Sequence, residues 1–198
     1  MKVLILSTSP RKGSLTLRFS RYLKNEILNS GIAESVHIQD FEDFDLPTIG
    51  RSKINTENPS TFQKSLLDSW NEAQVIIFCC PEYNWTTNGE VLIMTEQLSS
   101  KSFSYLFDNK VFAFAGTSSG RGGRLPALET AKVISKIISF QNQFSIVSPK
   151  ILEVHEIAQN LNENSLSKGN TVFESGVQDF ARYTLKVAAR WVIAEKFA

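Results

Sequence analysis

Three short apolar runs, each unbroken and each followed directly by a polar or glycine-rich loop, constrain the fold of this chain most. They are Lys2–Ser7, Gln74–Cys80 and Lys110–Gly116. β-Branched and aromatic residues dominate the runs, and no polar residue alternates with them, which is typical of strands buried on both faces of a sheet. We therefore expect a parallel sheet with helices on both of its faces.

The rest of the chain supplies weaker strands and clear helical patterns between the runs. Val36–Ile38, with Phe44–Leu46 as its extension, is the candidate for the second strand, and Phe144–Val147 for the last strand. Apolar residues recur at helical spacing in five further segments, which are Leu15–Leu28, Ser60–Glu72, Gly89–Leu98, Leu125–Ser139 and Glu174–Phe197. This alternation of strands and helices predicts a doubly wound α/β sheet with right-handed crossovers.

Length favours a single domain over residues 1–198, since domains of this size bury a large core. The last predicted helix carries a long apolar stripe that includes Phe180, Tyr183, Val187, Trp191 and Ile193. Such a stripe can pack on the sheet or can form a dimer interface. The sequence leaves both possibilities open.

Charge and composition exclude several classes of partner. The 21 basic and 20 acidic residues leave a net charge of +1, so no broad field attracts nucleic acid or a membrane surface. No segment approaches the ~20 apolar residues that span a bilayer, and the first apolar run is too short for a signal peptide. We therefore expect a cytoplasmic protein. The adjacent Cys79 and Cys80 are expected to be reduced, buried residues rather than a disulfide or a redox pair.

The loop Ser7–Thr16 joins the first buried strand to the first helix and combines several hydroxyl side chains with Arg11, Lys12 and Gly13. A helix N-terminus offers unpaired backbone N–H groups and a partial positive charge, which together bind phosphate. An ordinary helix cap at Ser14 explains one serine but not the other hydroxyls or Arg11. Neither a P-loop nor a Rossmann pattern occurs. A single terminal phosphate, as in flavin mononucleotide (FMN), suits a flavodoxin-like five-stranded sheet of order 2-1-3-4-5.

Two further loops follow the other buried strands and are expected at the same edge of the sheet. Pro81–Gly89 contains Tyr83 and Trp85, whose rings call either for a planar aromatic ligand or for packing of a tight turn on a helix. Gly116–Arg124 is rich in glycine, which permits close approach to a ligand or a flexible excursion of the chain. Arg121 and Arg124 can meet a second anion or lie in solvent.

Taken together, these loops resemble the NAD(P)H-dependent FMN reductase family of flavodoxin-like proteins, which includes azoreductases and quinone or chromate reductases. Ser9–Thr16 is similar to the phosphate loop G-S-x-R-x-x-S-x-N, Pro81–Asn84 matches P-E-Y-N, and Ser118–Gly123 resembles the glycine-rich third loop. The resemblance covers residues 1 to about 140 in order. Thr8 and Thr16 replace the usual Gly and Asn, and Asn88–Met94 departs from the usual P-G-x-L-K-N.

The resemblance implies bound FMN, with NADPH or NADH as co-substrate and a small electron acceptor such as a quinone, an azo compound, a flavin or a metal oxyanion. It implies phosphate contacts from the first loop and ring contacts, mostly through backbone, from the other two. The implied cofactor-binding residues are Ser9, Arg11, Ser14, Leu15, Thr16, Pro81, Glu82, Tyr83, Asn84, Ser118 and Gly120.

A homodimer or homotetramer is also implied, in which aromatic residues cover a neighbour's flavin. The candidates are Trp85, Phe103, Tyr105 and Phe107.

Flavin chemistry of this kind requires no catalytic side chain and no metal, because the cofactor carries the reaction. His37 and His155 lie outside the three loops, so we expect them to be structural or surface residues. The acidic segment Asp40–Asp45 has no His or Cys ligand nearby in the sequence, so we expect it to be a solvated or capping segment and not a metal site. The alternatives to an oxidoreductase are a non-enzymatic FMN-binding electron-transfer protein and a regulatory module.

Overall fold

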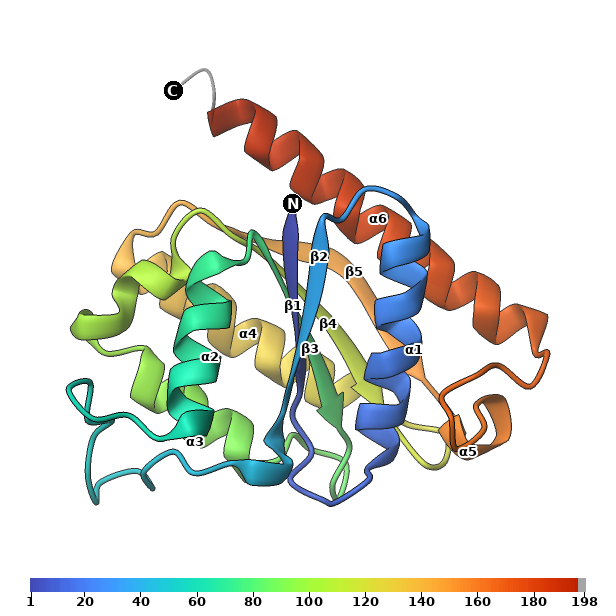
Figure 1. The fold of residues 1–198 in the computed structure, drawn as a ribbon, viewed down its shortest axis with the longest axis horizontal. Coiled ribbons are helices and arrows are strands. Elements are labelled where there is room, and N and C mark those ends of the chain that lie inside the picture. The colour runs from blue at the N-terminus through green and yellow to red at the C-terminus, as the bar shows by residue number, and fades with distance from the viewer. Residues whose placement is uncertain (196–198) are drawn as a thin grey trace.

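Five parallel strands in the order β2-β1-β3-β4-β5 form the sheet in the computed structural model, which describes residues 1–195 (Figure 1). This order confirms the predicted doubly wound topology. The three unbroken apolar runs form the central strands, and the weaker patterns form the edges. The strands are β1 (Lys2–Ser7), β2 (Ser35–Asp40), β3 (Val75–Pro81), β4 (Val111–Thr117) and β5 (Ile146–Val154).

Helices cover both faces of the sheet, as predicted (Figure 1). One face packs against α1 (Leu15–Asn29), α5 (Ile157–Asn160) and α6 (Thr171–Glu195), and the other against α2 (Thr61–Glu72), α3 (Gly89–Leu98) and α4 (Arg124–Gln141). Two short 3-10 helices, η1 (Phe41–Asp43) and η2 (Lys101–Phe107), complete the second layer. Successive residues of each central strand enter opposite cores, which explains why those strands are apolar throughout.

Two strand predictions were wrong in extent. Phe44–Leu46 is not a strand but an irregular segment after η1, and its apolar pattern reflects packing of Phe44 on Phe41 and Phe62. The last strand begins at Ile146 and continues through Pro149 to Val154, well beyond the predicted end. Because β5 is an edge strand, a proline without an N–H is tolerated there.

The last helix begins at Thr171, three residues before the predicted start, and the predicted end at Phe197 lies outside the described residues. Asn170 caps its first turn by accepting hydrogen bonds from the N–H groups of Val172 and Phe173. Phe180 is fully buried, and Trp191 packs partly against the same core and stacks on Phe144. Packing on the sheet therefore accounts for much of the apolar stripe. No described helix is long and apolar enough to cross a membrane.

Cys79 and Cys80 are free thiols that enter opposite cores, as the alternation of side chains along a strand requires. Both residues are fully buried. Burial disfavours the thiolate and raises the pKa of each thiol from 9.0 to about 12. The prediction that both cysteines are buried is confirmed.

The two buried thiols should make the fold less stable at alkaline pH. Since their pKa is higher in the folded chain than in the unfolded chain, their contribution is complete below about pH 9 and is lost as the pH rises toward 12. We expect the free energy of unfolding to fall by up to ~1.4 kcal/mol per pH unit for each thiol in this window. Urea unfolding at several pH values measures this slope, and a slope equally steep in the Cys79→Ala/Cys80→Ala variant would contradict the assignment.

Candidate functional site

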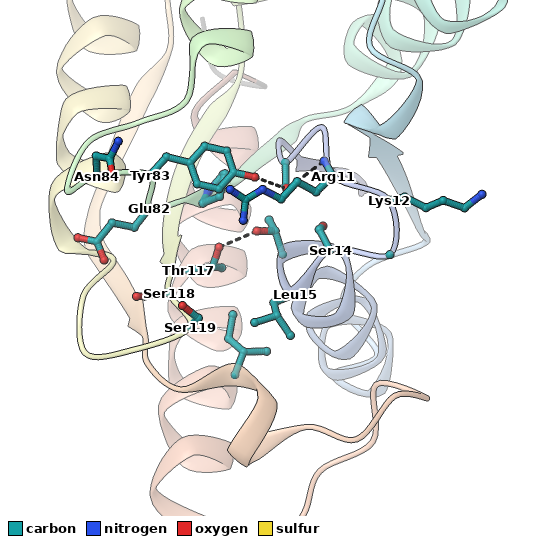
Figure 2. Close-up of a pocket in the computed structure, with 15 residues that line it drawn as sticks. Arg11, Lys12, Ser14, Leu15, Glu82, Tyr83, Asn84, Thr117, Ser118 and Ser119 are labelled. Atoms are coloured by element: carbon teal, nitrogen blue, oxygen red, sulfur yellow. Dashed lines mark hydrogen bonds between the residues drawn. The ribbon is translucent and has the colours of Figure 1, made fainter.

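The carboxyl ends of β1, β3 and β4 lie side by side, and the three predicted loops meet there around one cleft (Figure 2). The cleft has a volume of about 520 Å³, within the range of small-molecule sites. Its lining combines all but one of the predicted site residues with five that were not predicted. The lining residues are Ser9, Arg11, Lys12, Gly13, Ser14, Leu15, Thr16, Pro81, Glu82, Tyr83, Asn84, Thr117, Ser118, Ser119 and Ile157.

The first loop presents a row of unpaired backbone donors at the start of α1. Ser14 is the N-cap, and its Oγ accepts the N–H of Leu17 at 3.0 Å, so the cap interpretation is correct for this one oxygen. Among the described residues, no acceptor in the protein meets the N–H groups of Lys12, Ser14, Leu15 and Thr16. These groups and the N-terminal end of the helix dipole are the features that can seat an anion.

The hydroxyl groups near this seat differ in what they can still donate. Thr117 Oγ1 donates its single hydrogen to the carbonyl of Cys80 at 3.2 Å, so Thr16 Oγ1, 2.8 Å away, is the donor to Thr117. The buried Thr16 therefore has only its backbone N–H to offer a ligand. Ser14 Oγ accepts the cap bond and keeps its own hydrogen free.

Ser9 and Tyr83 bridge the first and second loops across the cleft (Figure 2). Their hydroxyl oxygens lie 2.7 Å apart. The Arg11 guanidinium covers the Tyr83 ring, with its central carbon 4.4 Å from the ring centroid, a cation–π contact. Arg11 is exposed and has no carboxylate partner among the described residues, whereas Lys12 extends away from the other lining side chains (Figure 2).

The second loop contains a tight two-residue turn with both central residues in the left-handed region. Asn84 and Trp85 have φ of 49° and 63°, and the flanking Tyr83 and Thr86 exchange two backbone hydrogen bonds of 3.1 Å. Left-handed backbone is unfavourable for a bulky residue such as Trp. The Trp85 side chain is 76% exposed, so the turn interpretation holds for the backbone but packing on a helix does not hold for this ring.

Glu129 of α4 anchors the turn. Its Oε2 accepts hydrogen bonds from Thr86 Oγ1 at 2.7 Å and from the Thr87 N–H at 2.9 Å. Further back in the loop, the Glu82 N–H donates to the carbonyl of Thr117 at 2.8 Å. The loop is thus tied to β4 at one end and to α4 at the other.

Two glycines of the third loop lie so close to other parts of the protein that a Cβ would overlap them. A Cβ on Gly116 would lie 1.5 Å from the carbonyl oxygen of Gly123, and one on Gly122 would overlap the Glu82 carboxylate. Gly120 does not line the cleft; its N–H donates to Ser118 Oγ at 3.2 Å, and its carbonyl accepts the Glu156 N–H at 2.9 Å. Close packing of backbone therefore explains Gly116 without a ligand, whereas Gly122 meets only the carboxylate end of the flexible Glu82 side chain.

The two arginines of the third loop face carboxylates. Arg124 forms an ion pair with Glu153, and Nε of the exposed Arg121 lies 4.0 Å from Oε1 of Glu156. A second anion would have to compete with these carboxylates.

The residues outside the three loops play smaller roles. His37 and His155 are exposed and do not line the cleft. Within the acidic segment, burial raises the pKa of Asp40, and Glu42 Oε2 accepts the Gly13 N–H at 3.3 Å. Among the described residues, no group of three His, Cys, Asp or Glu is arranged to hold a metal ion.

Removal of the Glu129 anchor should loosen the turn. We expect hydrogen exchange at the Thr87 N–H to accelerate by at least tenfold in Glu129→Ala, since a charge-assisted bond of this type contributes ~1.5–3 kcal/mol. Glu129→Gln keeps an acceptor oxygen and should retain part of the protection. Mass spectrometry or NMR of exchanging amides measures the effect, and equal protection in all three proteins would contradict this role for Glu129.

Residues 1–148 match the NADPH-dependent FMN reductase family. No curated protein matches the chain. Solved structures that resemble it include FerB, a flavoenzyme NAD(P)H:(acceptor) oxidoreductase from Paracoccus denitrificans, with a TM-score of 0.72, 17% identity and coverage of 96% of this chain and 97% of that one.

Two further solved structures share the fold. The apo form of EMOB, an NADH:FMN oxidoreductase, has a TM-score of 0.65 and 15% identity, with 94% of this chain and 89% of that one covered. An azoreductase from Bacillus anthracis has a TM-score of 0.52 and 15% identity, with 96% and 99% covered. At such identities these likenesses show the fold alone, whereas the family match spans three quarters of the sequence. The chain belongs to the NADPH-dependent FMN reductase family of oxidoreductases, which use FMN with a nicotinamide nucleotide as co-substrate.

Proposed function

We propose that the cleft holds FMN between the first and second loops and that the enzyme passes electrons from NADPH or NADH to a small acceptor such as a quinone, an azo compound or a flavin. One observation carries this proposal: residues at the start of α1 whose N–H groups have no acceptor in the described chain line the same 520 Å³ cleft as the loop Pro81–Asn84. A molecule with a phosphate at one end and a planar ring at the other suits both walls.

The phosphate end of the site rests mainly on backbone. The N–H groups of Lys12, Ser14, Leu15 and Thr16 and the free hydroxyl hydrogen of Ser14 are donors for phosphate oxygens. The Arg11 guanidinium adds a charged fork if it leaves the Tyr83 ring, since guanidinium can bind two phosphate oxygens at once. Ser9 supplies a further donor when Tyr83 donates to it.

At the ring end of the site, fewer backbone N–H groups are free to bind a ligand than the sequence predicts. The N–H groups of Glu82, Tyr83 and Ser118 are engaged within the protein. Among the described residues, the N–H groups of Asn84 and Ser119 have no acceptor in the protein and remain for the polar edge of a ring. Contacts from Pro81, Glu82, Tyr83, Ser118 and Gly120 stay predictions.

Bound FMN would supply the hydride-accepting ring atom and would transfer the electrons onward. The residues of this chain bind and orient the cofactor and the two substrates, and no side chain has to remove a proton. The exposed Arg11, Asn84 and Ser119 at the rim leave the cleft open to small molecules. A small, planar acceptor that reaches the ring directly is therefore the substrate class we propose.

The proposed activity is tested with the purified full chain, FMN and NADPH. We expect NADPH consumption to depend on added quinone and to stop without FMN, and a panel of quinones, azo dyes and free flavins ranks the acceptors. A protein that binds FMN but oxidises NADPH with none of them would overturn the proposed activity and favour an electron carrier.

Arg11 should matter for the phosphate and not for the ring. We expect Arg11→Ala to weaken FMN binding about tenfold or more, as a charge-assisted bond contributes ~1.5–3 kcal/mol, and to leave riboflavin binding nearly unchanged. Fluorescence titration of both flavins measures this difference. Arg51→Ala removes the same charge from an exposed residue outside the cleft and is the matched control. Equal weakening of both flavins would contradict the role of Arg11.

We further propose a homodimer or homotetramer located in the cytoplasm, with the whole chain acting as one FMN-binding domain. Phe103 and Phe107 are buried, so the expectation that they cover a neighbour's flavin is wrong. Trp85 and Tyr105 are exposed by 76% and 49% and stay candidates. Light scattering should give two or four times the chain mass of 22.2 kDa, and a monomer at micromolar concentration would contradict the proposal.

A further inference from the structure

A buried side-chain link joins the first and second loops beneath the cleft. Asn88 Nδ2 donates to the backbone carbonyl of Thr8 at 2.6 Å, and Thr8 Oγ1 lies 3.3 Å from Asn88 Oδ1 as donor. Thr8 immediately precedes Ser9 of the first loop, and Asn88 lies near the end of the second loop, which also carries Tyr83 and Asn84. Thr8 and Asn88 are 0% and 2% exposed and 80 residues apart in sequence.

The Asn88 side chain does not cap the helix that it precedes. Asn88 is the N-cap of α3, where an Asn side chain ordinarily accepts an N–H of the first turn, but it makes no such bond. Its second N–H goes instead to Glu90 Oε2 at 2.7 Å. Because the Thr8 carbonyl and the Glu90 carboxylate are both acceptors, the amide can be oriented in only one way.

Thr8 is itself held to the sheet. Its N–H donates to the carbonyl of Cys79, in β3, at 3.1 Å, and its single hydroxyl hydrogen is shared between that carbonyl, at 3.1 Å, and Asn88 Oδ1, at 3.3 Å. The link therefore fixes Asn88 relative to a residue that cannot shift without breaking the end of the β1–β3 ladder.

The spacing between the two loops is thus set at two points, by Thr8–Asn88 in the interior and by Ser9–Tyr83 at the surface of the cleft. A ligand that spans both loops gains affinity from fixed spacing, because it need not order the loops when it binds. A ligand that contacts one loop gains nothing from it.

We propose that Thr8 and Asn88 are positioning residues that set this spacing and thereby determine the preference of the site for FMN over riboflavin, which lacks the phosphate. This inference rests on the proposed FMN site. The link touches neither flavin; it holds the phosphate seat and the ring loop at the separation that one molecule of FMN bridges.

The test compares the dissociation constants of FMN and riboflavin, measured by flavin fluorescence on the full chain freed of bound flavin. Asn88→Leu removes the link and should raise the FMN constant about tenfold, while the riboflavin constant changes less than about twofold. Thr8→Val removes the hydroxyl, with its contacts to Asn88 and Cys79, keeps the Asn88 bond to the Thr8 carbonyl, and should raise the FMN constant about threefold. Thr8→Ser keeps the hydroxyl and should retain the wild-type ratio.

Two controls separate positioning from general destabilisation. Thr95→Val deletes another buried threonine hydroxyl, one that bonds only within α3 to the Leu92 carbonyl, and should leave the ratio unchanged. In Asn88→Leu the link between the loops is already broken, and the Thr8 hydroxyl keeps only its bond to the Cys79 carbonyl, so adding Thr8→Val should change the FMN constant little further. If Asn88→Leu does not fold, the nearly isosteric Thr8→Val decides.

The outcomes distinguish this inference from the proposal on which it rests. A wild-type chain that binds neither flavin would overturn both. Strong preference for FMN in the wild type, with the ratio unchanged in Asn88→Leu and Thr8→Val, would overturn the positioning role and leave the FMN site standing. Equal losses for the two flavins would show a merely structural role and would also overturn it.

Discussion

The alignment of the carboxyl ends of β1, β3 and β4 is the constraint on which the cleft depends. The ladder of backbone hydrogen bonds continues past the strands into the loops: the Thr8 N–H donates to Cys79, Glu82 to Thr117, and Ser118 to Val154, at 3.1, 2.8 and 2.9 Å. The first residue of each loop is therefore placed by the sheet and not by the loop itself. A rigid two-sided core behind these strands allows irregular backbone to hold a defined shape at the edge.

Many polar side chains near the cleft form hydrogen bonds within the protein. The sequence offers a series of hydroxyls in the first loop, but Thr16 donates to Thr117, and Thr8 lies against Cys79 and Asn88. What remains for an anion is chiefly backbone N–H at the start of α1, together with Ser14 and the unpaired charge of Arg11. Backbone donors need no ordering when a ligand arrives, so such a seat is preorganised. The side-chain hydroxyl groups thus hold the loops to the sheet, and the backbone N–H groups remain available for a ligand.

How far the sequence predicts this structure depends on how local each signal is. Burial on both faces removes all alternation from β1, β3 and β4, so their unbroken runs identify them and their topology places the three loops together. Phe44–Leu46 misled because packing beneath α2 produces the same alternation as a strand. Pro149 hid the length of β5, which an edge position permits. Ile157 and Glu129 come from distant segments through contacts that leave no local pattern. Thr117 and Ser119 lay inside a predicted loop, but the sequence does not show which residues of that loop point into the cleft.

The most direct test of the account follows the backbone amides of the full chain by NMR while flavins are added. If α1 seats the phosphate, the Leu15 and Thr16 amide resonances should shift with FMN and not with riboflavin, while those of Tyr83 and Asn84 should shift with both. Shifts confined to another surface, or Leu15 and Thr16 resonances that stay in place when FMN is bound, would contradict it.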